Sequence, residues 1–181
     1  MPTAEAAFKQ LALERPDQHW ELDCGRPRQK PGMTASHNRT MINLVVALYQ
    51  QLDRTEFDVR GNAGHVRRSS EHYYIPDVMV MPRNLVEPQL GKMQLEVYHE
   101  PLPLVVEIWS PSTGDYGVES KLLEYQRRGD LEIWLMHPYD RTLRAWRRQP
   151  DRLYPESIFA GGRVEAIALS GVVIDLDTLF E

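Results

Sequence analysis

The sequence predicts an α/β fold whose central β-sheet is at least partly parallel. Apolar runs at residues 104–109 and 131–136 have the length of buried strands, and a helical pattern at residues 115–128 separates them. Strands that enclose a crossover helix are expected to be parallel neighbours in one sheet. Asp115 is the expected cap of this helix, and Gly129 occupies a position where glycine favours a helix end.

Helical patterns also mark the first third of the chain. Residues 4–13 form a predicted short helix, which ends before Pro16 because the residue preceding a proline is pushed out of helical geometry. Residues 19–23 are expected to be extended. Ser36 is the expected N-cap of a longer helix over residues 37–52. Apolar side chains recur there at helical spacing, at Met41, Leu44, Val45, Leu48 and Leu52.

The other apolar segments have the character of strands. Two are predicted in the middle of the chain, at residues 57–67 and 73–81, with Gly61, Gly64 and residues 69–71 in turns or bends. Three more are predicted near the end, at residues 142–148, 164–169 and 172–176. No repeat or long linker divides the chain, so we expect a single domain covering residues 1–181.

Composition limits the classes of protein to consider. The chain has 42% hydrophobic and 26% charged residues, and no stretch approaches the roughly 20 apolar residues of a membrane span. We therefore expect no membrane partner. The first residues also lack a basic start followed by an apolar core, which argues against secretion and predicts a cytoplasmic protein.

Charge and cysteine content limit the possible ligands. Cys24 is the one cysteine, so a disulfide within the chain is impossible and carboxylates or histidines are expected to hold any metal. A net charge of −5 argues against broad attraction to phosphate backbones. Five arginines within twelve residues are either a local basic face or an ordinary solvated surface. They are Arg141, Arg144, Arg147, Arg148 and Arg152.

Glu107 and Asp77 are the candidate metal ligands. Glu107 interrupts an apolar strand, and a buried carboxylate is normally neutralised, ion-paired or bound to a cation. An arginine partner or an outward-facing side chain would also explain it. Asp77 follows Pro76 just before another apolar stretch, where turns are common. Two carboxylates on neighbouring strands can together hold a hard cation such as magnesium.

Lys121 is the third candidate. It shares one face of the predicted helix at residues 115–128 with Val118, Leu122 and Tyr125, so a lysine lies within an apolar stripe. The chain has four lysines among its 21 basic residues, so arginine supplies most of the basic surface. One interpretation places the ammonium beside the two carboxylates, where it either orients a water nucleophile or stabilises charge on a phosphate. The other is that the stem covers apolar surface while the ammonium reaches water.

Several segments of the sequence together match the pattern of a known family. They are residues 75–78, 105–113, 121–125 and 132–134 with Pro138, and finally residues 177–180. The most specific part is Glu107 with the following Ser-Pro-Ser-Thr and the downstream Lys121. From about Trp20 to the C-terminus, the sequence resembles the Uma-type putative restriction endonucleases of the PD-(D/E)XK nuclease superfamily.

The resemblance implies a restriction-endonuclease-like core, in which helices flank a mixed β-sheet. It further implies that Asp77 and Glu107 bind Mg²⁺ or Mn²⁺ and that Lys121 is the catalytic lysine. In the usual superfamily motif the lysine lies two residues after the acidic residue, but here Trp109 occupies that position. The family resemblance instead takes the lysine from the following helix.

Two further residues match the family, and two depart from it. His37 matches a histidine at the start of the first long helix, and Glu21 fits the early extended segment; both are possible supporting residues of the site. A structural histidine and a surface glutamate are the alternatives. Arg26 replaces a usual glutamate, and His137 replaces a usual aspartate before proline. These departures leave room for a member that kept the fold and lost the reaction.

The sequence thus predicts a metal-dependent DNA endonuclease with an Asp77, Glu107 and Lys121 site. Nucleic acid, and DNA in particular, is the expected partner, and a homodimer is plausible because cutting a duplex often uses two sites. One alternative is a catalytically inactive protein of the same fold that binds nucleic acid or takes part in an assembly. Another is a hydrolase that acts on a small phosphorylated compound, which the acidic net charge favours.

Overall fold

The computed structural model describes residues 3–112 and 114–181, without the side chains of residues 114–117. The helices are α1 (Ala4–Glu14), α2 (Ala35–Gln51), α3 (Arg83–Val86), the 3-10 helix η1 (Glu87–Gln89), α4 (Gly114–Arg128) and α5 (Leu176–Leu179). The strands are β1 (Trp20–Asp23), β2 (Arg26–Gln29), β3 (Phe57–Gly61), β4 (His65–Ser69), β5 (His72–Tyr74), β6 (Val78–Pro82), β7 (Val97–Tyr98), β8 (Leu104–Ile108), β9 (Glu132–His137), β10 (Thr142–Arg147), β11 (Glu156–Phe159), β12 (Arg163–Glu165) and β13 (Val173–Asp175).

The central sheet confirms the predicted mixed α/β fold. Its strand order is β11-β10-β9-β8-β6-β3. Strands β8 and β9 pair in parallel, with Val105 opposite Ile133, and the chain joins them through α4. The other pairings in this sheet are antiparallel. The prediction that a crossover helix links parallel neighbours is therefore correct at this step.

Two of the predicted strand segments each divide between two sheets, and the bend predicted at Gly64 lies at the division in the first of them. The segment at residues 57–67 contributes β3 to the central sheet and β4 to a second sheet, whose order is β2-β1-β5-β4-β7. The segment at residues 73–81 divides in the same way into β5 and β6. Asn62 and Gly64 adopt positive φ angles of 50° and 71°, which turn the chain from one sheet to the other.

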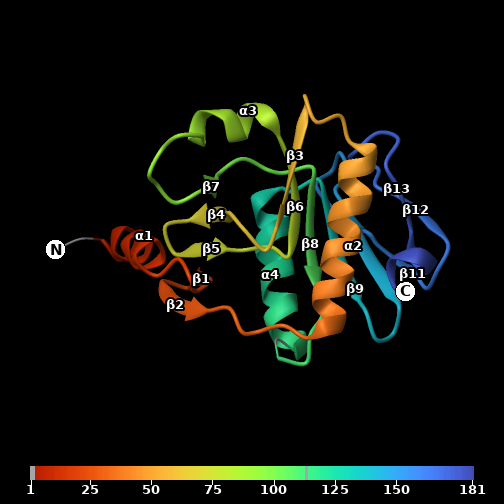
Figure 1. Cartoon of the computed structure of the whole chain (residues 1–181), viewed down its shortest axis with the longest axis horizontal. Helices are drawn as coiled ribbons and strands as arrows, with labels where there is room; N and C mark the ends of the chain where they lie inside the picture. Colours follow the sequence, from red (N-terminus) through yellow and green to blue (C-terminus); the bar gives the residue numbers. More distant parts are fainter. Residues whose placement is uncertain (1–2, 113) are drawn as a thin grey trace.

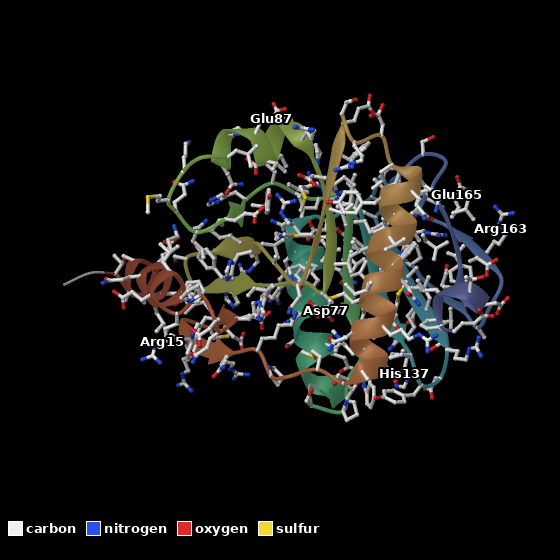
Figure 2. All side chains as sticks on the ribbon, viewed as in Figure 1. Arg15, Asp77, Glu87, His137, Arg163 and Glu165 are labelled. Atoms are coloured by element: carbon white, nitrogen blue, oxygen red, sulfur yellow. The ribbon has the colours of Figure 1, made fainter. Side chains whose placement is uncertain are left out.

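The crossing between the sheets positions Asp77. The backbone N–H of Asn62 donates to the carbonyl oxygen of Asp77 over 2.8 Å, so the two crossing segments are tied together. Asp77 immediately precedes β6 and is 1% exposed. In Figure 2 it lies near the middle of the molecule, whereas Arg15 and Glu87 lie at the periphery. The predicted metal ligand is therefore at the junction of the two sheets.

The two long helices cover opposite faces of the central sheet, and Figure 1 shows α2 in front of the strands and α4 behind them. Side chains alternate between the faces along β8. Val106 packs in the same core cluster as Leu44 of α2. Val105 instead packs with Tyr125 of α4. Glu107 shares the orientation of Val105, so its carboxylate faces α4.

Several boundaries differ from the predicted ones. The N-cap of α2 is Thr34, whose Oγ1 accepts from the backbone N–H of His37, and Ser36 lies inside the helix. Threonine and serine are both good caps, so composition alone did not distinguish them. The side chain of Asp115, predicted to cap α4, lies outside the described side chains. None of the helices in the described residues is long and apolar enough to cross a membrane.

Candidate functional site

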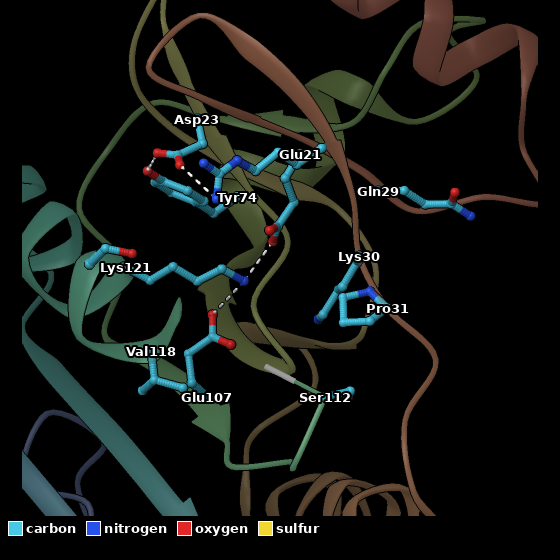
Figure 3. Close-up of a pocket in the computed structure, with 12 residues that line it drawn as sticks. Glu21, Asp23, Gln29, Lys30, Pro31, Tyr74, Glu107, Ser112, Val118 and Lys121 are labelled. Atoms are coloured by element: carbon cyan, nitrogen blue, oxygen red, sulfur yellow. Dashed lines mark hydrogen bonds and ion pairs between the residues drawn. The ribbon is translucent and has the colours of Figure 1, made fainter. Parts of the chain in front are cut away.

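A cavity of about 200 Å³ opens between the second sheet and α4. Glu21, Lys30, Glu107 and Lys121 are among the residues that line it. Figure 3 shows the two lysines reaching toward the cavity from opposite sides, with Glu21 and Glu107 between them. Four ionisable side chains from β1, β8, α4 and the segment after β2 therefore meet at one place, although they are far apart in the sequence.

Glu107 occupies the α4 side of the cavity. It is 6% exposed, so an outward-facing orientation does not explain it, and among the described residues its ion-pair partner is Lys121. Its Oε1 accepts a hydrogen bond from the Tyr125 hydroxyl over 2.5 Å and lies 3.5 Å from Nζ of Lys121. Burial raises the pKa of Glu107 to about 7, with the nearby Asp77 carboxylate adding to the rise and the Lys121 ammonium opposing it.

Lys121 points into the cavity and not into solvent. Its Nζ donates to Oε1 of Glu21 over 2.7 Å, and the side chain is 12% exposed. Burial alone would lower the pKa of Lys121, but the carboxylates of Glu107 and Glu21 outweigh burial and raise it. The snorkelling alternative fails because the ammonium is held by two carboxylates.

Glu21 belongs to this group and is not an ordinary surface residue. It lies on β1 and is 8% exposed. Besides Lys121, its Oε1 accepts from the backbone N–H of Ile75 over 2.9 Å. Glu21 therefore connects α4 with the segment that leads into Asp77.

Asp77 is held from three sides. Its Oδ2 accepts from the backbone N–H of Ile108 over 2.7 Å and lies 3.0 Å from Nε2 of His37. Its Oδ1 accepts from Nζ of Lys30 over 2.7 Å. Burial alone would raise the pKa of Asp77, but Lys30 and His37 outweigh it and hold the pKa well below its usual range. His37, from the first turn of α2, therefore reaches the site through Asp77.

Lys30 is a residue of the site that the sequence did not reveal. It follows the exposed strand β2, where arginine, proline and glutamine give no pattern of burial. Its side chain is nevertheless only 3% exposed, and its ammonium also donates to Oδ1 of Asn62 and to the carbonyl oxygen of Ile75. The sequence offered one signal for Lys30: lysine is rare in this chain, with four lysines among 21 basic residues.

The donor chemistry of the site fits a hard divalent cation. Carboxylates are the ligands that Mg²⁺ and Mn²⁺ prefer. Asp77 directly precedes β6, and Glu107 lies on the adjacent strand β8. The backbone N–H of Ile108, the residue after Glu107, donates a hydrogen bond to the Asp77 carboxylate. Each carboxylate sits in a buried environment where a cation would offset the cost of its charge.

A second set of metal-type donors lies in and beside the β1–β2 turn. Ligand atoms of Asp23, Cys24 and His72 lie within 4.8 Å of one another, and this is the one such group of three among the described residues. Two of these groups also have partners outside the trio, because Asp23 accepts from the Tyr74 hydroxyl and Nδ1 of His72 lies 2.9 Å from Oγ of Ser69. We therefore treat this trio as part of the hairpin.

The side chains of three of the five clustered arginines form ion pairs or hydrogen bonds with other parts of the chain. Arg144 forms an ion pair with Glu156, and Arg147 forms one with the buried Glu132 at 2.9 Å. Arg141 donates to the carbonyl oxygen of Asp177. Acidic partners therefore offset much of the positive charge that the sequence concentrates here, which weakens the interpretation of a basic face.

Comparisons with known proteins show to which family the chain belongs. Residues 6–177 match the model of the Uma2 family, which is described as "Putative restriction endonuclease". The chain belongs to the Uma2 family. This result confirms the resemblance that the sequence suggested. No curated protein matches the chain.

A solved structure supports the fold of this Uma2 protein. It is the crystal structure of a "putative nuclease" assigned to DUF820 from Anabaena variabilis. The two share 17% sequence identity with a TM-score of 0.79, and the match covers 99% of this chain and 98% of the other. At this identity the similarity establishes a nuclease-type fold and leaves the activity to be argued from the site.

Two departures from the nuclease motif lie side by side in this Uma2 protein. Trp109 occupies the usual lysine position, and its ring stacks on His137 at 4.3 Å with an interplanar angle of 26°. His137 is the residue that replaces the usual aspartate before Pro138. Arg26, the third departure, is exposed on β2. Lys121 brings an ammonium group from α4 into the cavity beside Glu107.

Proposed function

We propose that this Uma2 protein is a metal-dependent DNA endonuclease that hydrolyses phosphodiester bonds. The observation that carries the proposal is the position of Lys121, whose Nζ lies 3.5 Å from Glu107 inside the cavity. Asp77, directly before the adjacent strand β6, completes the Asp, Glu and Lys set of a nuclease site. Mg²⁺ or Mn²⁺ is the proposed cofactor, held by Asp77 and Glu107.

Each residue has a specific task in this mechanism. Asp77 and Glu107 would hold the cation, which would supply Lewis-acid polarisation of the phosphate and activation of the attacking water. Lys121 remains an ammonium at neutral pH, because the neighbouring carboxylates raise its pKa. It therefore acts as a positive charge that stabilises the developing negative charge on the phosphate, and not as a proton acceptor. Glu21 holds Lys121 in this orientation through the 2.7 Å hydrogen bond.

The remaining parts of the proposal concern partners and setting. DNA is proposed as the substrate because the family description is that of a restriction endonuclease. Two copies of a single domain, forming a homodimer in the cytoplasm, would present two sites to the two strands of a duplex. Analytical ultracentrifugation at micromolar concentration tests the dimer, which a single monomeric species would contradict.

The test of the proposed activity is cleavage of plasmid and single-stranded DNA with and without Mg²⁺ or Mn²⁺. Lys121→Met should reduce the rate by roughly 100-fold or more, because it removes a positive charge beside the reacting phosphate. Asp77→Asn should reduce the rate by roughly as much, because it removes a ligand of the proposed cation. Lys92→Met is the matched control, since Lys92 is an exposed lysine outside the cavity. Unchanged cleavage by Lys121→Met, or cleavage without a divalent cation, would contradict the proposal.

The alternative is an inactive member of the family that binds nucleic acid. The stacked pair of Trp109 and His137 favours it, because aromatic rings occupy two positions where the motif has charged groups. Such a protein would bind DNA with strong salt dependence in the presence of a chelator, and it would not cleave the DNA when Mg²⁺ is added.

A further inference from the structure

We infer that Lys30 is a built-in cation that competes with a divalent metal ion for Asp77, so that metal binds fully only when Lys30 moves away. This inference rests on the proposed function, in which Asp77 is a metal ligand. It gives the site a form of control that neither the family description nor the nuclease motif contains.

The contacts of Lys30 fit a resident counter-ion. Its Nζ donates three hydrogen bonds, to Oδ1 of Asp77 at 2.7 Å, to Oδ1 of Asn62 at 2.7 Å and to the carbonyl oxygen of Ile75 at 2.9 Å. An ammonium has three donors, so all of them are used. The partners are all oxygens, as they are for a bound hard cation.

Lys30 also separates Asp77 from the cavity. Lys30 lines the cavity together with Glu21 and Glu107, whereas Asp77 is not among the residues that line it. A cation arriving through the cavity therefore meets Glu107 and Glu21 first. It reaches Asp77 only if the Lys30 ammonium gives up its place on Oδ1.

The charges of the site make the two cations mutually exclusive. Three carboxylates, from Glu21, Asp77 and Glu107, face two ammonium groups, from Lys30 and Lys121. Adding a divalent ion to this set would leave a buried excess of positive charge, which is costly at low dielectric. If Lys30 moves out of the site, the three negative charges of the carboxylates are neutralised by one ammonium and the divalent metal ion.

Lys30 has room to move. It follows β2, an edge strand whose four residues are all exposed, and its side chain already borders a cavity of about 200 Å³. A lysine has a flexible stem of four carbons, so rotation of the side chain alone can carry the ammonium off Asp77. By contrast, His37 and the Ile108 N–H approach the other oxygen of Asp77 from a helix and a strand, which keep it in place.

The test measures metal binding to the whole chain without nucleic acid. Mn²⁺ and Mg²⁺ are titrated into the Cys24→Ser protein, which disables the Asp23, Cys24 and His72 trio, and binding is followed by calorimetry and by thermal unfolding. Adding Lys30→Met should tighten Mn²⁺ binding by roughly tenfold or more, because the competing cation is gone. Lys30→Arg keeps the charge and should not tighten binding, and Lys92→Met is the surface control.

The gain must depend on Asp77. Combining Lys30→Met with Asp77→Asn should abolish the increase in affinity, which separates relief of competition from a general loosening of the site. Equal Mn²⁺ affinity for Lys30→Met and its parent would overturn the inference. The inference would also be overturned if Lys30→Met increased the Mn²⁺ affinity of the Asp77→Asn protein.

A measurement on the unaltered protein covers the case in which Lys30→Met does not fold. Buried lysine ammonium groups exchange slowly enough to give ¹⁵N NMR signals, and saturating Mg²⁺ should shift or broaden the Lys30 signal as it leaves Asp77. A Lys30 signal unchanged by Mg²⁺ would overturn the inference. Neither measurement uses DNA. Metal-binding data therefore test this inference, whereas DNA cleavage tests the proposed function, and the failure of one can be told from the failure of the other.

Discussion

Asp77 directly precedes β6 and Glu107 lies on the neighbouring antiparallel strand β8, yet the two carboxylates occupy opposite electrostatic environments. Asp77 receives hydrogen bonds from Lys30 and the Ile108 N–H and lies beside His37, and its pKa is lowered. Glu107 receives the Tyr125 hydroxyl and a more distant Lys121, and its pKa rises to about 7. Both are almost fully buried, so burial does not account for the difference.

The difference shows that the nearest donors decide the charge of a buried carboxylate. Close ammonium and amide donors favour the ionised form, whereas a neutral hydroxyl and a lysine shared with Glu21 do not offset the cost of burial at Glu107. The Asp77 carboxylate therefore stays ionised at neutral pH. Glu107 changes its charge near neutral pH unless a further cation is present.

The largest expected effect comes from removing the Asp77 carboxylate. Asp77→Asn should lower the free energy of unfolding by about 3–5 kcal/mol, because it leaves the buried Lys30 ammonium without its charged partner. Urea unfolding in a chelating buffer measures this change. Asp140→Asn, at a side chain that is 70% exposed, is the control and should change stability by less than about 0.5 kcal/mol. A similar loss in both variants would remove the distinction between the buried and exposed carboxylates.

A medium effect is expected at Glu107, and it depends on pH. The pKa of Glu107 rises from 4.5 to about 7 on folding, so the folded protein holds this proton more tightly than the unfolded chain. The stabilisation is fully present below pH 4.5 and is lost as pH rises through 7. Without metal, the loss amounts to at most about 3 kcal/mol.

Glu107→Gln isolates this contribution. The glutamine does not titrate, so the difference in unfolding free energy between the wild type and the variant should change between pH 5 and pH 8, in favour of the variant at the higher pH. A difference that stays constant over this range would show that Glu107 keeps an ordinary pKa. Saturating Mn²⁺ should reduce the pH dependence of the wild type.

The smallest effect is expected at the arginine cluster. Arg144 and Glu156 form an ion pair whose side chains are 41% and 35% exposed, so Arg144→Ala should cost at most about 1 kcal/mol, and less in high salt. Chemical denaturation at two salt concentrations measures the change. A loss as large as that of Asp77→Asn would contradict the view that the strong electrostatics of this protein are confined to the buried site.

The residues of the site that the sequence revealed share one property. Glu107 and Lys121 are charged residues inside apolar patterns, and such patterns are local, so a strand or a helix displays them without knowledge of the fold. The parallel step between β8 and β9 was predictable for the same reason, since a helix between two buried strands restricts how they can pair.

The parts that could not be predicted depend on contacts between distant segments. Lys30 lies 47 residues before its partner Asp77, in a segment that is otherwise exposed. No local pattern marks it. Likewise, alternating residues at 57–67 indicate strands but not the two sheets to which they belong, because the positive φ angles of Asn62 and Gly64 determine that division.

The most direct test of the central claim is a crystal structure with Mn²⁺, in which anomalous scattering locates the metal. We expect an anomalous peak between the carboxylates of Asp77 and Glu107, with the Lys30 ammonium turned away from Oδ1 of Asp77. A crystal without a peak at this position at millimolar Mn²⁺, or with the metal bound at the Asp23, Cys24 and His72 trio alone, would contradict it.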